Sequence, residues 1–333
     1  MLFIILKIHI YYLEKIVIKK ILLSILCLFL VGFSFAKSPE EVNVAALNGP
    51  SGIGMAYLFE TNPDLEGVKS NFEVVASADV LLPKLLKGEV DIGILPPNAA
   101  AKVYNKNKGA IVMGAIVGEG MLSIVSTDDS VNSLADLKGK TLTVAGQGAT
   151  PEYMIRYLAA KEGISLEGGK DGIELDFSIP NAEIAAALAA GKIKNALVPE
   201  PFATVACTNA KNCRRAVNIQ ELWGKDNFPM TVVVINAKFA SEYPETVQSF
   251  LDAYKDSIYW TNKYPVAAGA LVEKHTLGLK AMIAAKAIPN ANFSFTYGKD
   301  SKAKIESLLS VFLDFAPEAI GGKLPDNKFY FGL

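Results

Sequence analysis

The chain has 333 residues, of which 51% are hydrophobic and 20% are charged. This composition excludes a disordered or low-complexity chain, and the length exceeds what one hydrophobic core usually supports, so we expect two packed units. The formal net charge of −1 offers no basic surface of the kind that nucleic-acid-binding proteins carry. We therefore expect no nucleic acid as a partner.

The first 36 residues have the pattern of an export signal. Lys19 and Lys20 precede an uncharged apolar run over 21–33, and small residues follow at both positions of a cleavage site. We expect cleavage after Ala36 and a location in the periplasm. An uncleaved anchor helix remains an alternative, because the apolar run is nearly long enough to span a bilayer.

Two further features of this segment bear on the export prediction. A lipoprotein is not expected, because the large residue Leu26 precedes Cys27. The residues before Ile16 are unusual for a signal peptide, which suggests that translation starts further downstream.

Cleavage would remove His9 and Cys27 and leave His275, Cys207 and Cys213. The two cysteines have C-x5-C spacing and would lie in an oxidising compartment, which favours a disulfide over free thiols. No second Cys pair and no His pair accompanies them in the sequence. No zinc site, other metal or cofactor is therefore expected.

Short apolar runs alternate with amphipathic stretches from residue 39 on, which predicts α/β structure. Strands are expected over 42–47, 71–76, 90–95, 111–117, 121–126, 141–145, 173–179, 193–198 and 230–236. Helices are expected over 53–59, 77–86, 99–106, 151–162, 182–190 and 301–315, and from residue 244 onward.

Polar residues mark several of the predicted helix starts. Ser77 and Asn181 are interpreted as N-caps only, and Thr150 as the N-cap of a helix with Pro151 at its first position. Ser133 and Asp136 have the spacing of a capping box, which predicts a short helix there.

Two stretches can be aligned without gaps: LLKGEVDIGILPP at 85–97 and LAAGKIKNALVPE at 188–200. In both, a helix ends at Gly, a strand follows, and Pro comes the same number of positions after the Gly. This repetition favours two similar α/β lobes. Few strands remain after 230–236, so the helical tail should pack back on the first lobe. Lobe 1 is then 37–126 and 236–333, and lobe 2 is 127–235.

Four loops follow predicted strands and begin helices, at 48–54, 95–98, 146–150 and 198–202. In open α/β sheets ligands bind outside the carboxyl ends of strands, where helix N-termini present free N–H groups. None of these loops contains Lys or Arg, so an anion there would depend on dipoles and hydrogen bonds. The expected ligand-binding residues are Asn48, Ser51, Gly52 and Asn98 from the first lobe, and Gln147, Ala149, Thr150 and Glu200 from the second.

Some of these residues keep two interpretations. Glu200 lies between two prolines at a strand end, where it either braces its loop or accepts a hydrogen bond from a ligand. Tyr57, Phe202 and Trp260 either wall the pocket or belong to the core.

Catalytic residues are not expected. His275 is interpreted as an exposed helix residue, and the sequence has no G-x-S-x-G elbow and no P-loop. The glycines of GPSGIGM lack the G-x-G-x-x-G spacing of dinucleotide-binding loops.

The stretches that carry these features resemble periplasmic solute-binding proteins of ABC importers, of the nitrate/sulfonate/taurine type. They are ALNGPSGIGM, LLKGEVDIGILPPNAAAKVYNK, SLADLKGKTLTVAGQGATPEYMIRYLAAKEGI, ALVPEPF and GGKLPDNKFYF. The resemblance implies a type 2 periplasmic-binding fold with two lobes, two crossings near 126–128 and 233–236, and the ligand in the cleft. Thiamine-precursor binders of this superfamily carry a CCCFC-type motif, which this sequence lacks.

The expected function is that of a monomeric receptor that binds a small polar or anionic solute and delivers it to an ABC permease. Two other functions remain open. An enzyme on the same fold would need paired carboxylates facing the cleft, and a sensory receptor would bind solute and dock to a signalling partner.

Overall fold

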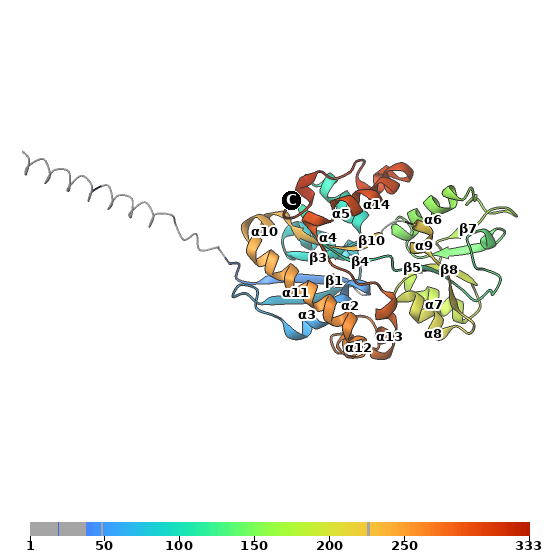
Figure 1. Cartoon of the computed structure of the whole chain (residues 1–333), viewed down its shortest axis with the longest axis horizontal. Helices are drawn as coiled ribbons and strands as arrows, with labels where there is room; N and C mark the ends of the chain where they lie inside the picture. Colours follow the sequence, from blue (N-terminus) through green and yellow to red (C-terminus); the bar gives the residue numbers. More distant parts are fainter. Residues whose placement is uncertain (1–18, 20–37, 48, 225–226) are drawn as a thin grey trace, which may run out of the picture. The chain divides into compact units, whose positions relative to one another are not determined.

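Two β-sheets with helices packed on them define two lobes (Figure 1). The computed structural model describes Lys19 and residues 38–47, 49–224 and 227–333. The expected signal segment, except Lys19, and the candidate residue Asn48 lie outside these ranges. None of the helices in the described part of the chain is both long enough and apolar enough to cross a membrane.

The sheet of the first lobe has six strands in the order β11-β4-β10-β3-β1-β2. β1 pairs parallel with β2 and β3, whereas β10 pairs antiparallel with β3 and β4, and β11 with β4. The strands are β1 Val42–Leu47, β2 Ser70–Val75, β3 Ile92–Leu95, β4 Ile111–Glu119, β10 Pro229–Asn236 and β11 Thr296–Tyr297.

The sheet of the second lobe has five strands in the order β7-β6-β8-β5-β9. β6 pairs parallel with β7 and β8, whereas β5 pairs antiparallel with β8 and β9. The strands are β5 Leu122–Ser126, β6 Thr141–Val144, β7 Glu174–Asp176, β8 Asn195–Pro199 and β9 Arg214–Asn218.

The aligned stretches 85–97 and 188–200 occupy equivalent places in the two lobes. β3 lies between a parallel neighbour, β1, and an antiparallel one, β10, while β8 lies between its parallel neighbour β6 and its antiparallel neighbour β5. The predicted similarity of the lobes is therefore confirmed at the level of strand pairing.

The chain crosses between the sheets earlier than expected in both directions. β4 ends at Glu119 in the first sheet and β5 already belongs to the second, so the first crossing is at 120–121, not 126–128. The whole of β10 lies in the first sheet, so the return precedes Pro229 and the expected 233–236 is wrong. The crossings lie side by side, because the Gly120 N–H donates to Phe228 O over 2.9 Å. Apolar runs identified these strands but could not assign them to a sheet.

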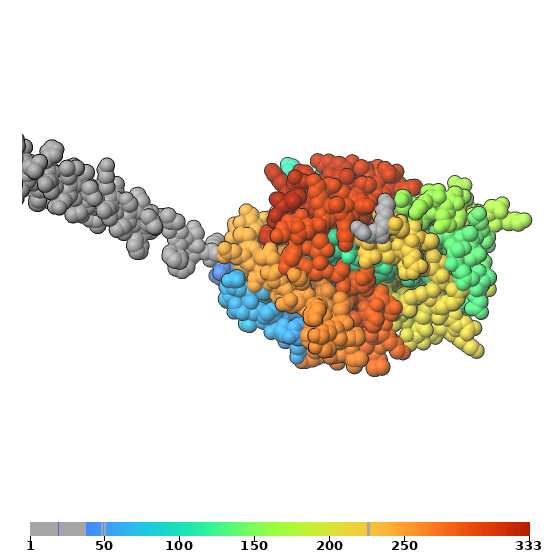
Figure 2. All heavy atoms as spheres, viewed as in Figure 1, coloured from blue at the N-terminus to red at the C-terminus, as the bar shows by residue number. Residues whose placement is uncertain are grey.

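Most helices of the first lobe come from its C-terminal part, which packs back on the first sheet as expected. Figure 2 shows these segments, coloured orange to red, on the surface of this lobe. The helices are α2 Pro50–Gly54, α3 Ala56–Thr61, α4 Ala78–Lys87, α5 Pro97–Lys106, α10 Ala237–Glu242, α11 Pro244–Lys263, α12 Pro265–Lys274, α13 Ala281–Ala287 and α14 Lys302–Phe315, with 3₁₀ turns at Ile288–Asn290, Gly298–Asp300, Pro317–Ile320 and Asn327–Phe329.

α11 is the longest helix of this lobe and carries the apolar face that the sequence predicted. Its residues Val247, Phe250, Leu251, Tyr254 and Ile258 are all buried in the core that also includes strands β1, β3 and β10. Burial of such side chains contributes about 1.5–3 kcal/mol each relative to exposure, which fixes the helix on the sheet.

The second lobe is smaller and contains the disulfide. Cys207 at the end of α8 is bonded to Cys213, which precedes β9, so the predicted pairing is confirmed. The helices of this lobe are α6 Thr150–Lys161, α7 Asn181–Ala189, α8 Phe202–Asn209 and α9 Ile219–Trp223, with a 3₁₀ turn at Ala135–Leu137.

An apolar core runs continuously from one lobe to the other. Tyr153 on α6 packs edge-on against Phe312 on α14, with ring centroids 4.8 Å apart. Tyr157 on α6 contacts Phe315 in the same way. The C-terminal helix α14 therefore supports the second lobe as well as the first.

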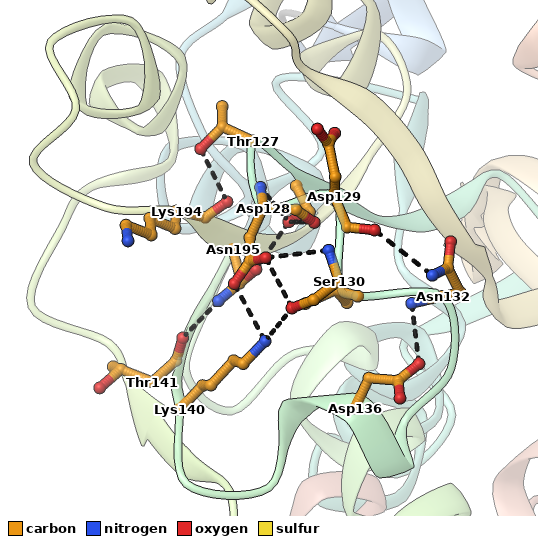
Figure 3. A network of polar contacts seen from close by, with 12 residues as sticks. Thr127, Asp128, Asp129, Ser130, Asn132, Asp136, Lys140, Thr141, Lys194 and Asn195 are labelled. Atoms are coloured by element: carbon orange, nitrogen blue, oxygen red, sulfur yellow. Dashed lines mark hydrogen bonds and ion pairs between the residues drawn. The ribbon is translucent and has the colours of Figure 1, made fainter.

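A polar network joins the end of β5 and the loop after it to the starts of β6 and β8 (Figure 3). Lys140 Nζ lies 2.9 Å from Asp128 Oδ2, and Ser130 donates its hydroxyl to Asp128 Oδ1 over 2.6 Å. Ser126 donates its hydroxyl to Asn195 Oδ1 over 2.8 Å, which joins β5 to β8. Hydrogen bonds from Ser130 and Lys140 hold the pKa of Asp128 well below its usual range.

The helix starts differ from the sequence prediction in detail. Ala149, not Thr150, is the N-cap of α6, and Pro180, not Asn181, is the N-cap of α7. Ser77 is at the N-cap position of α4, but its side chain makes no capping bond. Short polar residues therefore located these helix starts to within one residue but did not identify the capping position.

One predicted helix is divided in two. The expected helix over 53–59 is interrupted at Met55, between α2 and α3. Ser257 on α11 inserts its hydroxyl into the break, donating to Gly54 O over 2.9 Å and accepting from Leu58 N over 3.1 Å. These two backbone groups would bond each other in a continuous helix, so the side chain replaces that bond.

Candidate functional site

A cavity of about 230 Å³ lies between the two lobes. It sits at the carboxyl ends of β1, β3, β6 and β8, where ligands of open α/β sheets bind. Its lining contains residues of both lobes and no charged side chain among the described residues. The lining residues are Leu47, Ser51, Ile94, Leu95, Pro96, Met121, Ala145, Gly146, Ala149, Thr150, Pro151, Asn181, Pro199, Met230 and Thr231.

Thr150 supplies a polar group that has no hydrogen-bond partner among the residues that the structure describes. It is the first residue of α6, lines the cavity and is 2% exposed. Its Oγ1 is buried and forms no hydrogen bond. A buried hydroxyl without a partner costs about 1–3 kcal/mol, so a ligand group that bonds it would recover this free energy.

Asn98 links the lobes across the cleft. It lies in the first turn of α5, is 5% exposed, and its Nδ2 donates to Gly148 O of the second lobe over 3.4 Å. Its Oδ1 is buried and has no hydrogen-bond partner. Asn98 is absent from the cavity lining, as is its partner Gly148, although Pro96 and Ala149 beside them line the cavity.

Ser51 lines the cavity, but its hydroxyl is already engaged. Its Oγ donates to Leu47 O over 2.9 Å and accepts from Leu47 N over 3.0 Å. It therefore ties the first turn of α2 to the end of β1. The adjacent candidate Gly52 lies outside the lining, where an added Cβ would come within 3.2 Å of Leu47 O.

Side chains of helix α11 bond to the backbone of α2 and α3. Tyr254 donates its hydroxyl to Ser51 O over 3.4 Å, and Ser257 binds Gly54 and Leu58 as described above. Burial raises the pKa of Tyr254 far above its usual range, so its hydroxyl remains a donor. Because α11 is anchored in the core, these bonds fix α2 on the first-lobe side of the cavity.

Glu200 is placed as a brace. It is 2% exposed, and its Oε2 accepts from Thr204 N over 3.2 Å. Its Oε1 accepts from Arg215 Nε over 2.8 Å, and the same guanidinium donates to the Thr204 hydroxyl over 2.6 Å. Its neighbour Pro199 lines the cavity, whereas Glu200 does not. Of the two interpretations, this geometry favours the brace.

Glu152 was missed by the sequence reasoning. It lies in the first turn of α6, is 7% exposed, and its Oε2 accepts from Gly148 N over 2.7 Å. Its Oε1 accepts from Arg156 Nε over 2.8 Å. The signal was present in the sequence, because an acidic residue in the first helical turn followed by Arg at i+4 is a stabilising pattern.

The remaining candidates divide between the cavity and its surroundings. Ala149 lines the cavity, whereas Gln147 is exposed and outside the lining. Asn181, which had been interpreted as a cap only, is exposed and lines the cavity. The structure does not describe Asn48, so its contact with a ligand stays a prediction.

The aromatic residues considered as pocket walls lie elsewhere. Tyr57 stacks on Trp260 with ring centroids 4.5 Å apart, and Phe202 packs on the small core of the second lobe. Met121 at the first crossing, and Met230 and Thr231 at the start of β10 just after the return crossing, line the cavity instead. Sequence reasoning missed these three because the crossings had been placed too late in the chain.

Two similar α/β lobes with a cavity between them, at the carboxyl ends of their strands, define the type 2 periplasmic-binding fold. Residues 54–273 match the NMT1-like family, and the chain belongs to this family.

Solved structures share this fold over most of their length. An ABC transporter from Parabacteroides distasonis is 26% identical, with a TM-score of 0.77, and the match covers 88% of this chain and 99% of that one. The periplasmic aliphatic sulphonate binding protein of Escherichia coli is 15% identical, with a TM-score of 0.70 and coverage of 87% and 93%. The periplasmic nitrate-binding protein of Synechocystis PCC 6803 is 13% identical, with a TM-score of 0.62 and coverage of 84% and 83%. No curated protein sequence matches the chain.

Proposed function

We propose that the protein is the solute-binding receptor of an ABC importer. It captures a small polar or anionic solute in the cavity between its lobes and delivers it to a membrane permease. The observation that supports this most directly is the cavity itself, which both lobes line and into which Thr150 brings a buried hydroxyl without a partner. The family and the two periplasmic neighbours, which bind a sulphonate and nitrate, support the same function.

The proposed ligand contacts come from both lobes. Asn48 and Ser51 contribute from the first lobe, and Ala149 and Thr150 from the second, while Asn98 joins the two lobes beside the cavity. Contacts from both sides stabilise a closed form by the difference between the ligand's affinities for the closed and open forms. The lobes are proposed to hinge at the paired crossings near Gly120 and Phe228, which are joined by one backbone hydrogen bond.

One experiment distinguishes binding of a solute from its chemical conversion. Calorimetry and thermal unfolding with nitrate, alkanesulfonates, taurine and small neutral amides should reveal at least one solute that raises the unfolding temperature, since a ligand that binds only the folded state stabilises it. Mass spectrometry should recover that solute unchanged after incubation. Conversion into a product would show that the protein is an enzyme acting in the cleft and not a receptor. The failure of every solute to bind would contradict the proposed function.

The proposal also includes export of the protein and a monomeric state. Residues 1–36 act as a signal peptide cleaved after Ala36, because two lysines, an apolar run and small residues follow each other in the required order. The mature protein is a monomer in the periplasm. N-terminal sequencing and sizing of protein recovered from the periplasm test both points, and a retained apolar segment would favour a membrane anchor.

A further inference from the structure

Of the three helices that begin on the second-lobe side of the cleft, α6 and α8 have carboxylates near their N-terminal ends, whereas α7, whose first residue Asn181 lines the cavity, has no side-chain cap. Glu152 accepts the N–H of Gly148 just before α6, over 2.7 Å, and Glu200 accepts the N–H of Thr204 in the first turn of α8, over 3.2 Å. Free N–H groups and the helix dipole make such ends attractive to anions. At α6 and α8 a carboxylate of the protein therefore already accepts an N–H that an anionic ligand could otherwise use.

An arginine side chain pairs with each of the two carboxylates. Arg156 Nε donates to Glu152 Oε1, and Arg215 Nε donates to Glu200 Oε1, each over 2.8 Å. Neither arginine lines the cavity, and the described lining residues include no Lys, Arg or His. An anion enclosed there would lose its hydration without gaining a cation, which is costly.

The groups that remain free suit an uncharged ligand. Most of the cavity wall is apolar, and the Thr150 hydroxyl is buried without a partner. A hydroxyl both donates and accepts, so it matches a neutral amide, sulfonamide or hydroxyl group. On the first-lobe side, α2 and α5 each have proline in the first turn, which removes one N–H that an anion could use.

We infer that the ligand is an uncharged molecule, with a compact apolar body and a neutral hydrogen-bonding group held by Thr150. Glu152 and Glu200 disfavour anionic analogues, because they already accept N–H groups before α6 and in α8 and already pair with the nearby arginines Arg156 and Arg215. The inference rests on the proposed function and narrows its range of polar or anionic solutes to the uncharged ones.

Matched pairs of probes test the preference. Benzamide and benzoate, propane-1-sulfonamide and propane-1-sulfonate, and acetamide and acetate differ mainly in charge, and their affinities for the mature protein can be measured by calorimetry and thermal unfolding. We expect the neutral member of a pair that binds to bind at least about tenfold more tightly, a factor equivalent to the upper range of one charge at a helix end. Tighter binding of the anionic members, or of nitrate, overturns the inference while leaving the receptor function intact. Absence of binding by every probe contradicts the proposed function, and the inference falls with it.

Charge variants test the role of the carboxylates. Glu152→Gln keeps an acceptor for the Gly148 N–H but removes the negative charge, so affinity for the anionic probe should rise about threefold to tenfold relative to its neutral partner. Glu162→Gln, at the exposed C-terminal end of the same helix, is the matched control and should leave the ratio unchanged. Glu200→Gln repeats the test at α8, and thermal unfolding shows whether each variant is folded. An unchanged ratio in both folded variants overturns the inference.

Discussion

Asn98 of the first lobe and Gly148 of the second are joined by a hydrogen bond across the cleft, from Nδ2 to the carbonyl oxygen over 3.4 Å. The Gly148 N–H is in turn held by Glu152, which Arg156 orients. The loop before α6 is therefore fixed from its own helix and presented to the opposite lobe. This arrangement couples the position of the loop to closure of the two lobes.

Asn98→Ala should weaken ligand binding more than folding. It removes the bond between the lobes, which is worth about 0.5–1.5 kcal/mol, and with it a buried oxygen that has no partner. Affinity for a solute found by screening should fall about threefold to tenfold by calorimetry. Asn107→Ala, at the C-terminal end of α5, is the control and should leave affinity unchanged. Equal affinities for the Asn98 variant and the unmodified protein would show that this contact does not support closure.

Thr150→Val should separate binding from stability. Because Thr150 is not the helix cap and its hydroxyl has no partner, replacing the hydroxyl by a methyl group should not lower the free energy of unfolding. Affinity should fall by about 1–3 kcal/mol if the hydroxyl binds the ligand. Thr261→Val on α11 removes another buried, unpartnered hydroxyl and should leave affinity unchanged. Calorimetry and denaturant unfolding measure both quantities, and full affinity in Thr150→Val removes the residue from the site.

Ser257→Ala should destabilise the protein and disturb the break between α2 and α3. The change leaves Gly54 O and Leu58 N without their hydroxyl partner inside the core, at a cost of about 1–3 kcal/mol. Ser301→Ala removes a buried serine that makes one bond, to Gly298 O, and should cost less. Urea unfolding compares the two. A loss for Ser257→Ala no larger than for Ser301→Ala would mean that the two bonds do not hold the break between α2 and α3.

The disulfide should be intact in exported protein and should stabilise the second lobe. The bonded cysteines are 6 positions apart, and closing so short a loop is expected to contribute about 2 kcal/mol. Thiol labelling of the denatured, unreduced protein should therefore find neither Cys207 nor Cys213 free. The double variant Cys207→Ser, Cys213→Ser should unfold at lower urea concentration. Labelling of both thiols would contradict the pairing and the oxidising location together.

The network around Asp128 should give an acid-sensitive contribution to stability. Hydrogen bonds from Ser130 and Lys140 lower the pKa of this carboxyl in the folded protein, so they stabilise the fold above the unfolded pKa of about 3.9. This contribution is lost as the pH falls through the lower folded value. Ser130→Ala should be less stable than the unmodified protein at pH 7, and the difference should shrink below about pH 4.

Ser310→Ala serves as the control for this pH dependence. Ser310 donates to the backbone oxygen of Glu306, an acceptor that does not titrate, so its effect should be the same at both pH values. Chemical unfolding at each pH measures the differences. A Ser130→Ala effect that stays constant into strong acid would contradict the assigned cause of the pKa shift.

Local patterns predicted most of the strands but not all of them. β1 is an apolar run bounded by a turn, and its predicted and observed limits coincide. β9, with the sequence RRAVN, has no apolar alternation and was not predicted, because it is an edge strand whose partner β5 defines it. The expected strand over 173–179 shortens to β7, Glu174–Asp176, for the same reason.

The candidate site shows the same division. The loops after β1, β3, β6 and β8 were identified from turn residues and helix starts, and all four contribute to the cavity. The roles of single residues were not predicted correctly. Ser51 and Glu200 are residue types that often bind ligands, but here they bond to backbone groups nearby in the sequence. Met121 and Met230 gave no signal, because an apolar residue beside a crossing resembles any core residue.

The amino-acid sequence by itself determined the alternation of strands and helices, the two similar lobes and the paired cysteines, because apolar period, turn residues and spacing are local properties. Only the tertiary structure decided where the chain crosses between the sheets, how Ser257 divides a helix across about 200 residues of sequence, and how Asn98 reaches Gly148 of the other lobe. These features depend on partners that are distant in sequence, and their hydrogen bonds exist only after both elements are packed.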